Sequence, residues 1–232
     1  MEWENSIVSD LEWGKTIANR EEKEKIASTI ASMVKEGDII GVGSGSTAYL
    51  ALNSIAKRVK EEQLNIRVIP TSQEIKLHCS RLTIPLTSLL EHKPDWTFDG
   101  ADEVDNELNM IKGRGGAMFK EKLLISSSPR TYIIVDPSKR VNKLGSRFPV
   151  PIEVFPEALT HVNEVLRAYN PGEINLRMAE GKDGPVITEN GNFILDVRFD
   201  NIPNNLEEAI KSITGVIESG LFLHYPVTLL QA

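Results

Sequence analysis

The sequence predicts an α/β protein: a Rossmann-like, mostly parallel sheet with helices on both faces, plus a smaller inserted α+β domain. Short apolar runs alternate with helical segments from residue 38 to residue 135, which is typical of a parallel sheet covered by helices. A buried strand, a loop of glycines and hydroxyls and a helix follow one another between residues 38 and 60. Near Pro149 the order of elements changes, which predicts the smaller domain.

Hydrophobic periodicity predicts the elements of the main sheet. Apolar residues on one face indicate a helix over residues 22–34, and Gly37 stands just past its end. Residues 1 to about 19 show no clear pattern, so we expect a lead-in or a fragment of helix there. We expect further helices over 48–60 and 73–80, a short element over 84–90, and strands over 38–42, 65–70, 95–98 and 132–135.

Beyond Pro149 the pattern is that of a small α+β unit. It reads as a strand (150–154), a helix (157–169), a strand (174–179) and two strands joined through 189–192, where Asn-Gly is a strong hairpin signal. A helix capped by Asn204 or Asn205 follows, and apolar stretches over 216–223 and 227–230 could return to the first sheet. We therefore predict a main domain over 1–149 and 204–232 and a small domain over 150–203.

Composition limits the classes of function. Hydrophobic residues at 41% and charged residues at 25% are typical of a globular protein, and a net charge of -7 argues against a nucleic-acid-binding surface. Cys79 is the only cysteine and the four histidines lack ligand spacing, so the sequence indicates no disulfide and no metal site. There is no bilayer-length apolar run and no signal-peptide pattern. We expect a cytoplasmic protein with no membrane partner.

The loop Gly43-Ser44-Gly45-Ser46-Thr47 is a candidate anion site. Glycines let backbone N–H groups approach a ligand, and the following helix adds partial positive charge at its N-terminus. The loop lacks the Gly-Lys-Ser/Thr ending of a P-loop and the third glycine of the dinucleotide fingerprint, so a single phosphate fits better. A plain strand-to-helix turn capped by Ser46 or Thr47 remains the alternative.

The densest cluster of chemical groups lies between residues 98 and 122. It holds four early carboxylates, a lysine, a glycine run over 113–116 and a later glutamate: Asp99, Asp102, Glu103, Asp105, Lys112 and Glu121. If the strand ends at Phe98, Asp99 and Asp102 both lie in the next loop, where close carboxylates can share a proton near neutral pH. Lys112 offers a positive charge to an oxyanion, and Glu121 can act as a general base.

Each of these residues also has an ordinary explanation. Asp99 and Asp102 could be turn or cap residues. Lys112 could be a surface lysine, and Glu121 could lie on a solvated helix face with a salt-bridging partner. The grouping of all of them within 25 residues favours the functional interpretation. Together with a phosphate loop, the parts match an aldose–ketose isomerisation of a sugar phosphate, in which a base moves a proton between neighbouring carbons through an enediolate.

Six segments resemble, in order and spacing, the ribose-5-phosphate isomerase A family: GVGSGSTA, DGADEVD, KGRGGAMFKEK, DPSKRVNKLG, PIEV and TENGNFILDV. The resemblance runs from about Glu22 onward. It implies interconversion of D-ribose 5-phosphate and D-ribulose 5-phosphate in the pentose phosphate pathway of carbohydrate metabolism, without metal or cofactor. It also implies a cytosolic homodimer or homotetramer and a Rossmann-like main domain with a small α+β domain inserted.

The resemblance also implies roles for single residues. Glu121 would be the general base, Lys112 would stabilise the enediolate, and Asp99 would assist ring opening with Asp102 beside it. The other positions that match substrate contacts of the family are Lys23, Ser44, Gly45, Ser46, Thr47, Gly100, Ala101, Gly113, Arg114, Gly115 and Lys139.

Two positions depart from the family pattern. Arg114 stands where the family has glycine, so this position lacks glycine's freedom at positive φ. One residue near Arg147 is extra and is expected in a loop. Two other functions stay open: a sugar-phosphate-binding sensor without chemistry, and an isomerase or deaminase acting on a different phosphosugar.

Overall fold

The computed structural model describes Val8 and residues 16–231, so most of the predicted lead-in over residues 1–19 lies outside the described residues. The chain forms two compact units. Among described residues, unit 1 contains those up to Gly100, Leu123–Ser138 and the stretch from Val227. Unit 2 contains Ala101–Lys122 and Lys139–Pro226. These limits differ from the predicted domain boundaries, because residues 101–122, 139–149 and 204–226 group with the small α+β region. The boundaries of independently folding domains stay a prediction.

Unit 1 is built on a parallel sheet. Its strand order is β12-β6-β3-β1-β2, and every neighbouring pair is parallel. The strands are β1 (Ile39–Val42), β2 (Arg67–Pro70), β3 (Trp96–Asp99), β6 (Thr131–Val135) and β12 (Val227–Gln231). The predicted parallel sheet is confirmed, and β12 is the stretch expected to return to it. The carboxyl ends of β1, β2 and β3 meet at one edge, where α/β proteins bind ligands.

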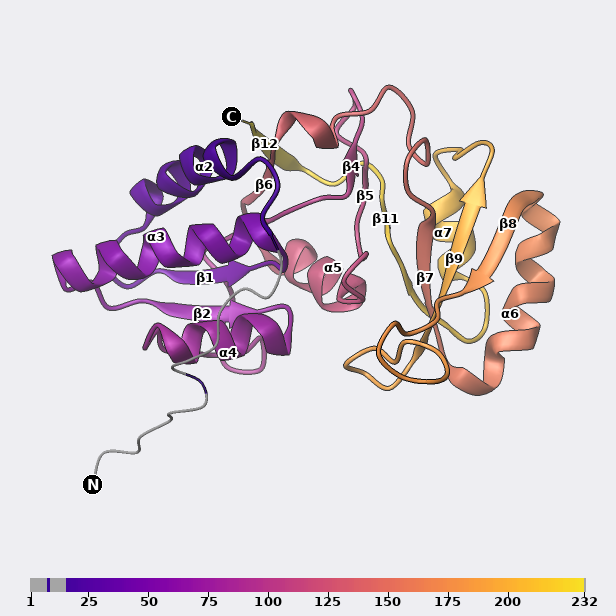
Figure 1. The fold of residues 1–232 in the computed structure, drawn as a ribbon, viewed down its shortest axis with the longest axis horizontal. Helices are drawn as coiled ribbons and strands as arrows, with labels where there is room; N and C mark the ends of the chain where they lie inside the picture. Colours follow the sequence, from indigo (N-terminus) through magenta and orange to yellow (C-terminus); the bar gives the residue numbers. More distant parts are fainter. Residues whose placement is uncertain (1–7, 9–15, 232) are drawn as a thin grey trace. The chain divides into compact units, whose positions relative to one another are not determined.

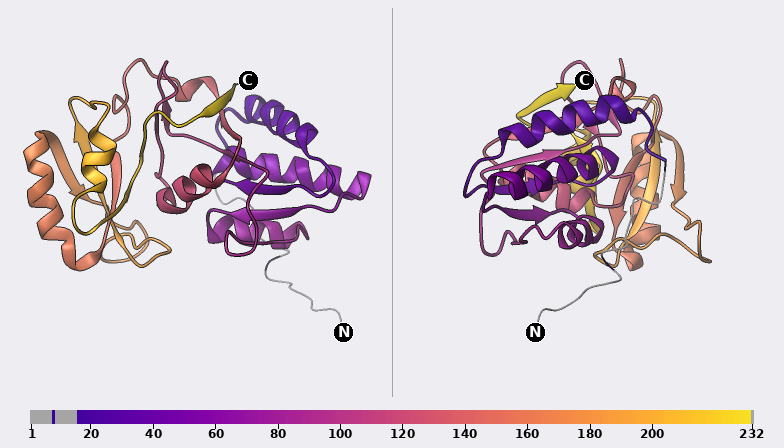
Figure 2. Two further views of the ribbon diagram at one scale, coloured as in Figure 1. Left: turned by 180° about the vertical axis from the view of Figure 1, so that it is seen from behind. Right: turned by 60° about the vertical axis from the view of Figure 1, so that its left-hand side comes forward.

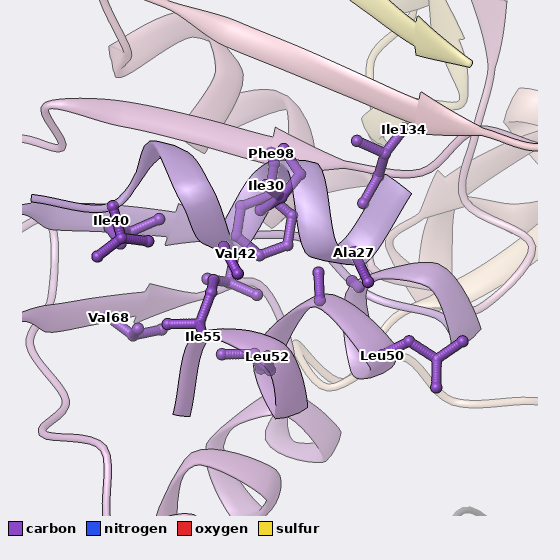
Figure 3. Close-up of a cluster of buried hydrophobic side chains, with 14 of the residues drawn as sticks. Ala27, Ile30, Ile40, Val42, Leu50, Leu52, Ile55, Val68, Phe98 and Ile134 are labelled. Atoms are coloured by element: carbon purple, nitrogen blue, oxygen red, sulfur yellow. The ribbon is translucent and has the colours of Figure 1, made fainter. Parts of the chain in front are cut away.

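Helices cover both faces of this sheet. On one face, α2 (Arg20–Met33) and α3 (Ser46–Glu62) lie side by side, and α4 (Gln73–Arg81) joins the same core (Figure 1). Ile40, Val42 and Phe98 point from the strands toward these helices (Figure 3). On the other face a Cβ added at Gly41 would lie 2.9 Å from Leu124 Cγ of α5 (Met118–Ser127). Only glycine therefore allows α5 to pack so closely on β1.

Unit 2 contains a four-stranded antiparallel sheet of order β10-β7-β9-β8. Two helices, α6 (Leu159–Leu166) and α7 (Leu206–Lys211), share a buried apolar core with it (Figure 2). Short 3-10 helices η2 (Pro156–Ala158) and η3 (Arg167–Tyr169) flank α6. The strands are β7 (Val150–Val154), β8 (Pro171–Leu176), β9 (Phe193–Phe199) and β10 (Val216–Ser219). This is the α+β region expected after Pro149.

A second sheet in unit 2 was not predicted. β4 (Glu103–Val104), β5 (Met110–Ile111) and β11 (Leu221–Phe222) form an antiparallel sheet of order β11-β5-β4. Each strand has two residues, too few for hydrophobic alternation to be visible in a sequence. The sheet matters because Lys112 directly follows β5. The short 3-10 helix η1 (Pro137–Lys139) follows β6.

Three element predictions need correction. The hairpin turn is present, since Thr188 N donates to Asn192 O at 2.8 Å, but the residues before it form no strand. Both edges of β9 are taken by β7 and β8, so a further partner has no place. The segment 84–90 contributes a single bridge, Leu86 to Val68, rather than an element. The stretch 216–223 does not return to the main sheet but supplies β10 and β11 to unit 2.

Across the part of the chain that the structure describes, no helix combines the length and apolar character needed to cross a membrane.

Candidate active site

The loop after β1 carries the first group of predicted site residues. Gly45, at φ 100° and ψ 174°, is the N-cap of α3, and the helix begins at Ser46 rather than at residue 48. No side-chain hydrogen bond caps this helix, so the interpretation of Ser46 or Thr47 as a plain cap is wrong. The first N–H groups of a helix have no partner within it, and they favour anions. The loop therefore has the backbone of an anion site.

A cluster of hydroxyls adjoins this loop. Ser44 Oγ donates to Ser72 Oγ at 2.9 Å and lies 2.9 Å from Thr71 Oγ1. Ser72 in turn accepts from Ile75 N at the start of α4, so its position is fixed by a helix cap. Thr71 and Ser72 were not among the predicted site residues. The available signal was that they directly follow a strand, as the loop at Gly43 does.

Lys23 brings a buried cation to the same loop. Its Nζ donates to Ser46 Oγ at 3.1 Å and lies 3.6 Å from Asp136 Oδ2. Asp136 is buried and also accepts from Asn19 Nδ2 and Ser138 N, each at 2.9 Å. Burial alone would raise the pKa of Asp136, but the hydrogen bonds from Ser138 and Asn19 and the charge of Lys23 outweigh it and lower that pKa. Asp136 was missed because its partner is distant in the sequence.

Asp99 is the last residue of β3, not a loop residue as expected, and it is fully buried. A Cβ added at Gly43 would lie 1.8 Å from Asp99 Oδ1, so the carboxylate occupies the space that glycine leaves open. Gly100 N donates to the same oxygen at 2.7 Å. Unit 1 thus gathers Asp99 and Gly100 beside the loop.

In unit 2 the structure pairs Lys112 with Glu121. Lys112 Nζ lies 3.4 Å from Glu121 Oε2, and the two residues are 2% and 5% exposed. The interpretations as surface lysine and solvated glutamate are therefore wrong. Lys112 N donates to Gly220 O at 2.9 Å, and its ammonium lies 5.6 Å from the centre of the Phe222 ring. A buried carboxylate can serve as a general base, and a cation this close can stabilise the oxyanion that forms when a carbon-bound proton is removed.

The glycine run between them forms a tight turn. Gly113 and Gly116 have φ of 93° and 82°, and Gly116 N donates to Gly113 O at 2.9 Å. Arg114 lies outside the positive-φ region, so a side chain at this position causes no backbone strain. Its N donates to Asp102 Oδ2 at 3.1 Å, which attaches the predicted acidic loop to the turn.

Two cations of unit 2 share one aromatic ring. The Arg114 guanidinium lies 5.2 Å and the Lys139 ammonium 5.6 Å from the centre of the Phe148 ring. Such cation–π contacts hold long side chains in place while leaving the charge available. Phe148 was missed by sequence reasoning, which treated its neighbourhood only as a loop with an extra residue.

Two of the four acids have structural roles. Glu103 is fully buried and accepts from the backbone N–H groups of Gly145, Arg147 and Phe148, each at 2.7 Å. Asp105 accepts from Glu107 N and Asn109 N, each at 2.9 Å. Both carboxylates thus hold neighbouring loop backbone in place.

The predicted site residues form two groups, each within one compact unit. The unit 1 group is Lys23, Ser44, Gly45, Ser46, Thr47, Asp99 and Gly100, and the unit 2 group is Ala101, Asp102, Lys112, Gly113, Arg114, Gly115, Glu121 and Lys139. Among the described side chains, no three of histidine, cysteine, aspartate or glutamate gather where they could hold a metal ion.

Comparison of the sequence with protein families and curated proteins gives consistent matches. The model of ribose 5-phosphate isomerase A (phosphoriboisomerase A) matches residues 67–232. The chain is 44% identical over 211 residues to "Ribose-5-phosphate isomerase A" of Thermosynechococcus vestitus, covering 89% of each. It is 43% identical over 209 residues to the protein of that name from Methanocaldococcus jannaschii, covering 89% of this chain and 92% of the relative.

Solved structures agree. The ribose 5-phosphate isomerase A of Methanocaldococcus jannaschii superposes with a TM-score of 0.88 at 40% identity, covering 92% of this chain and 95% of the other. A D-ribose-5-phosphate isomerase in complex with phospho-erythronic acid gives 0.85 at 39% identity, with 91% and 95% covered. Together with the matching fold and segments, these similarities show that the chain belongs to the ribose 5-phosphate isomerase A family, a family of isomerases.

Proposed function

We propose that this protein interconverts D-ribose 5-phosphate and D-ribulose 5-phosphate through an enediolate, with Glu121 as the general base. The observation that carries the proposal is the buried contact of 3.4 Å between Lys112 Nζ and Glu121 Oε2. A fold gains little from burying a single ion pair, because removing both charges from water costs about as much as their attraction returns. A reaction that moves a proton and develops an oxyanion uses both groups.

The chemistry needs one base and one cation. Glu121 removes the proton from C2 of the open-chain aldose, and the electron pair moves onto the C1 carbonyl oxygen to give the enediolate. Lys112 stabilises the negative oxygen. The hydroxyl proton passes from the C2 oxygen to the C1 oxygen, and Glu121 returns its proton to C1 while the C2 oxygen becomes the carbonyl of the ketose. A positioned base contributes about 10² to 10⁴ in rate. No external oxidant or reductant is needed, because the substrate is only rearranged.

Asp99 and Asp102 are proposed to handle protons of the sugar hydroxyls. The family resemblance assigns Asp99 to ring opening, which moves a proton between the ring oxygen and the anomeric hydroxyl. Its complete burial and its contact with Gly43 support an aspartate held in a fixed position. Asp102 contacts the turn through Arg114 N and is proposed to contact substrate hydroxyls.

We propose that the loop of unit 1 binds the phosphate. Lys23 supplies a fixed cation, Ser46 and Thr47 supply hydroxyls, and the start of α3 supplies N–H groups. The remaining proposed substrate contacts are Ser44, Gly45, Gly100, Ala101, Gly113, Arg114, Gly115 and Lys139. The resemblance further leads us to propose a role in the pentose phosphate pathway, in the cytoplasm, as a homodimer or homotetramer.

A family relative lends chemical support. The D-ribose-5-phosphate isomerase that is 39% identical to this chain is in complex with phospho-erythronic acid. That ligand carries a phosphate and a planar, anionic carboxylate, and an enediolate is likewise planar and anionic. A site that stabilises the intermediate should therefore bind this acid.

The test is turnover by the purified full chain. Ribose 5-phosphate is supplied with EDTA and ribulose 5-phosphate is measured over time, for the wild type and for Glu121→Gln. We expect turnover by the wild type and a loss of about 10² to 10⁴ in kcat for Glu121→Gln. Glu189→Gln is the control, because Glu189 forms a partly exposed ion pair with Lys120 and should leave kcat unchanged.

Binding of phospho-erythronic acid, measured by calorimetry, separates the remaining outcomes. Retained binding by Glu121→Gln with lost turnover supports Glu121 as the base. Binding by the wild type without any turnover favours the sugar-phosphate sensor instead. Wild-type kcat in Glu121→Gln contradicts the assigned base.

A further inference from the structure

We propose that Lys122 is a positioning residue: with Phe222, it holds the first turn of α5 so that the Glu121 carboxylate faces Lys112. The inference rests on the proposed role of Glu121 as the base. It concerns a lysine that was not among the predicted site residues and to which the proposed reaction gives no step.

Lys122 is anchored more completely than a helical lysine usually is. It is 6% exposed, and its Nζ donates to three acceptors: Glu207 Oε1 at 2.6 Å, Leu221 O at 2.7 Å and Glu218 Oε1 at 2.9 Å. These three bonds satisfy every donor of an ammonium group. Most lysines keep the charged end in water, so this geometry fixes the side chain and the helical turn that carries it.

Two of the three acceptors of Lys122, Glu218 and Leu221, lie in the segment that also holds Lys112. Lys112 N donates to Gly220 O at 2.9 Å, and a Cβ added at Gly220 would lie 2.2 Å from Lys112 O. Leu221, whose carbonyl accepts from Lys122, pairs with Ile111 in the sheet. One short segment, residues 218–222, therefore sets the positions of both lysines and couples β5 to α5.

Phe222 lies against both ammonium groups. Lys122 Nζ is 4.7 Å and Lys112 Nζ is 5.6 Å from the centre of its ring, and Phe222 is fully buried. A ring face attracts cations, most strongly where water is excluded. The ring thus favours a position close to it for both ammonium groups.

The helical geometry explains why this matters for Glu121. Adjacent residues of an α-helix point about 100° apart, so the direction of Glu121 depends on the rotation of the turn that Lys122 fixes. A general base works only when its carboxylate lies within hydrogen-bond reach of the proton it removes. A small rotation of the turn would increase the distance between Glu121 and Lys112.

Lys122 also stabilises the native fold, because its ammonium balances the charges of Glu207 and Glu218. Glu218 Oε2 also lies 3.3 Å from Lys211 Nζ, and Glu207 also accepts from Leu223 N and Tyr225 Oη. Removing the Lys122 ammonium would take one of two cations from the buried Glu218 and would leave the partly buried Glu207 without this ion pair, so a loss of stability is expected as well. The test has to separate this loss from misplacement of the base.

The experiment compares three full-length variants with the wild type by steady-state kinetics and urea unfolding. Lys122→Met should lower kcat by about tenfold to a hundredfold while KM changes less than threefold, since a misplaced base affects the chemical step. Lys122→Met combined with Glu218→Gln should recover stability, because one buried carboxylate is neutralised, but not kcat. Lys120→Met, one residue before Glu121 and 30% exposed at its side chain, is the matched control and should keep kcat within twofold.

A double-mutant cycle with Glu121→Gln decides whether Lys122 acts through Glu121. If it does, Lys122→Met adds little to the loss already caused by Glu121→Gln. Wild-type kcat in Lys122→Met, full additivity in the cycle, or recovery of kcat together with stability in the Glu218→Gln combination would each overturn the inference. If Glu121→Gln itself keeps wild-type kcat, the proposed function fails instead, and the two failures are thereby distinguished.

Discussion

Lys23 and Asp136 form a buried ion pair in which the carboxylate orients the ammonium toward the α3 loop. The Lys23 Nζ lies 3.6 Å from Asp136 Oδ2 and donates to Ser46 Oγ at 3.1 Å. Asp136 is itself fixed by Asn19 and Ser138. The Asp136 carboxylate neutralises part of the charge of Lys23, and it also fixes the direction of the Lys23 ammonium.

The first prediction concerns this pair. Asp136→Asn should raise KM for ribose 5-phosphate about tenfold and change kcat less than threefold, because Lys23 loses its orienting charge and an anion contact weakens by about 1.4 kcal/mol. Steady-state kinetics measures both constants. Lys23→Met should raise KM at least as much; unchanged KM in both variants would show that this lysine does not serve the substrate.

The second prediction concerns Gly43. In Gly43→Ala the new methyl group would meet the Asp99 carboxylate, so either the side chain or the strand end has to shift. We expect kcat to fall by about 10² and stability to fall by about 1–3 kcal/mol. Gly181→Ala is the control, because a Cβ there meets nothing within 4 Å and the backbone needs no positive φ. Equal activity in the two variants would contradict the packing of Gly43 against Asp99.

The third prediction concerns Arg114. Because its backbone is unstrained and its guanidinium lies over Phe148, Arg114→Gly should leave the fold intact. Loss of a cation proposed to contact an anionic substrate should raise KM about twofold to fivefold at low ionic strength, with the difference decreasing at high salt. KM measured across a salt series is the readout. Equal KM for Arg114→Gly and the wild type at low ionic strength would contradict a contact between Arg114 and the substrate.

The fourth prediction separates structural from chemical acids. Glu103→Gln replaces one acceptor oxygen of a carboxylate that receives three backbone N–H groups, leaving a buried donor without a partner. We expect a loss of about 2–4 kcal/mol in the free energy of unfolding. Urea unfolding measures it, and the kcat of the folded fraction should stay near the wild-type value. Asp105→Asn, on a more exposed turn, should cost less.

The fifth prediction concerns pH. Burial, aided by the charge of Arg81 and opposed by a hydrogen bond to Tyr49 O, lowers the pKa of His78 from 6.5 to about 4. Between these values the unfolded chain binds a proton that the folded protein does not, so stability falls as pH decreases from 6.5 to about 4. The loss from this group is at most about 3 kcal/mol.

His78→Phe keeps an aromatic ring against Tyr49, whose centre lies 4.1 Å from the His78 ring, but it cannot titrate. Its unfolding free energy should depend less on pH across this range, as measured by urea unfolding at several pH values. Parallel pH curves for the variant and the wild type would exclude His78 as the titrating group.

The sequence predicted the main elements where periodicity extends over a whole helix or strand. The helix around Ile26 and the strand over 150–154 are examples, and the structure confirms both. Prediction from the sequence failed where an element is fixed by a contact with a residue far away in the chain. Nothing near β5 indicates that Gly220 would pair with Lys112, and two-residue strands carry no pattern. The Asn-Gly turn was found, but pairing of β9 with β7 and β8 decided against the expected hairpin.

In the candidate site, too, residues grouped in the sequence were predicted and residues with distant partners were missed. Glu121 and Lys112 were predicted from their grouping and the family resemblance, and the structure pairs them. Asp136, Phe148 and Lys122 were missed, because their importance depends on burial and on partners far along the chain.

The position of β12 at the edge of the parallel sheet has a consequence for biosynthesis. Val227–Gln231 pairs with Thr131–Val135, and everything between residues 139 and 226 belongs to unit 2. A ribosome therefore completes unit 2 before it delivers β12. Until then, the edge of β6 that β12 will cover has no partner strand. Pairing between such distant segments is slow, and an unpaired strand edge invites association with other chains. During synthesis, the β6 edge is thus open to wrong pairing until Val227–Gln231 has emerged.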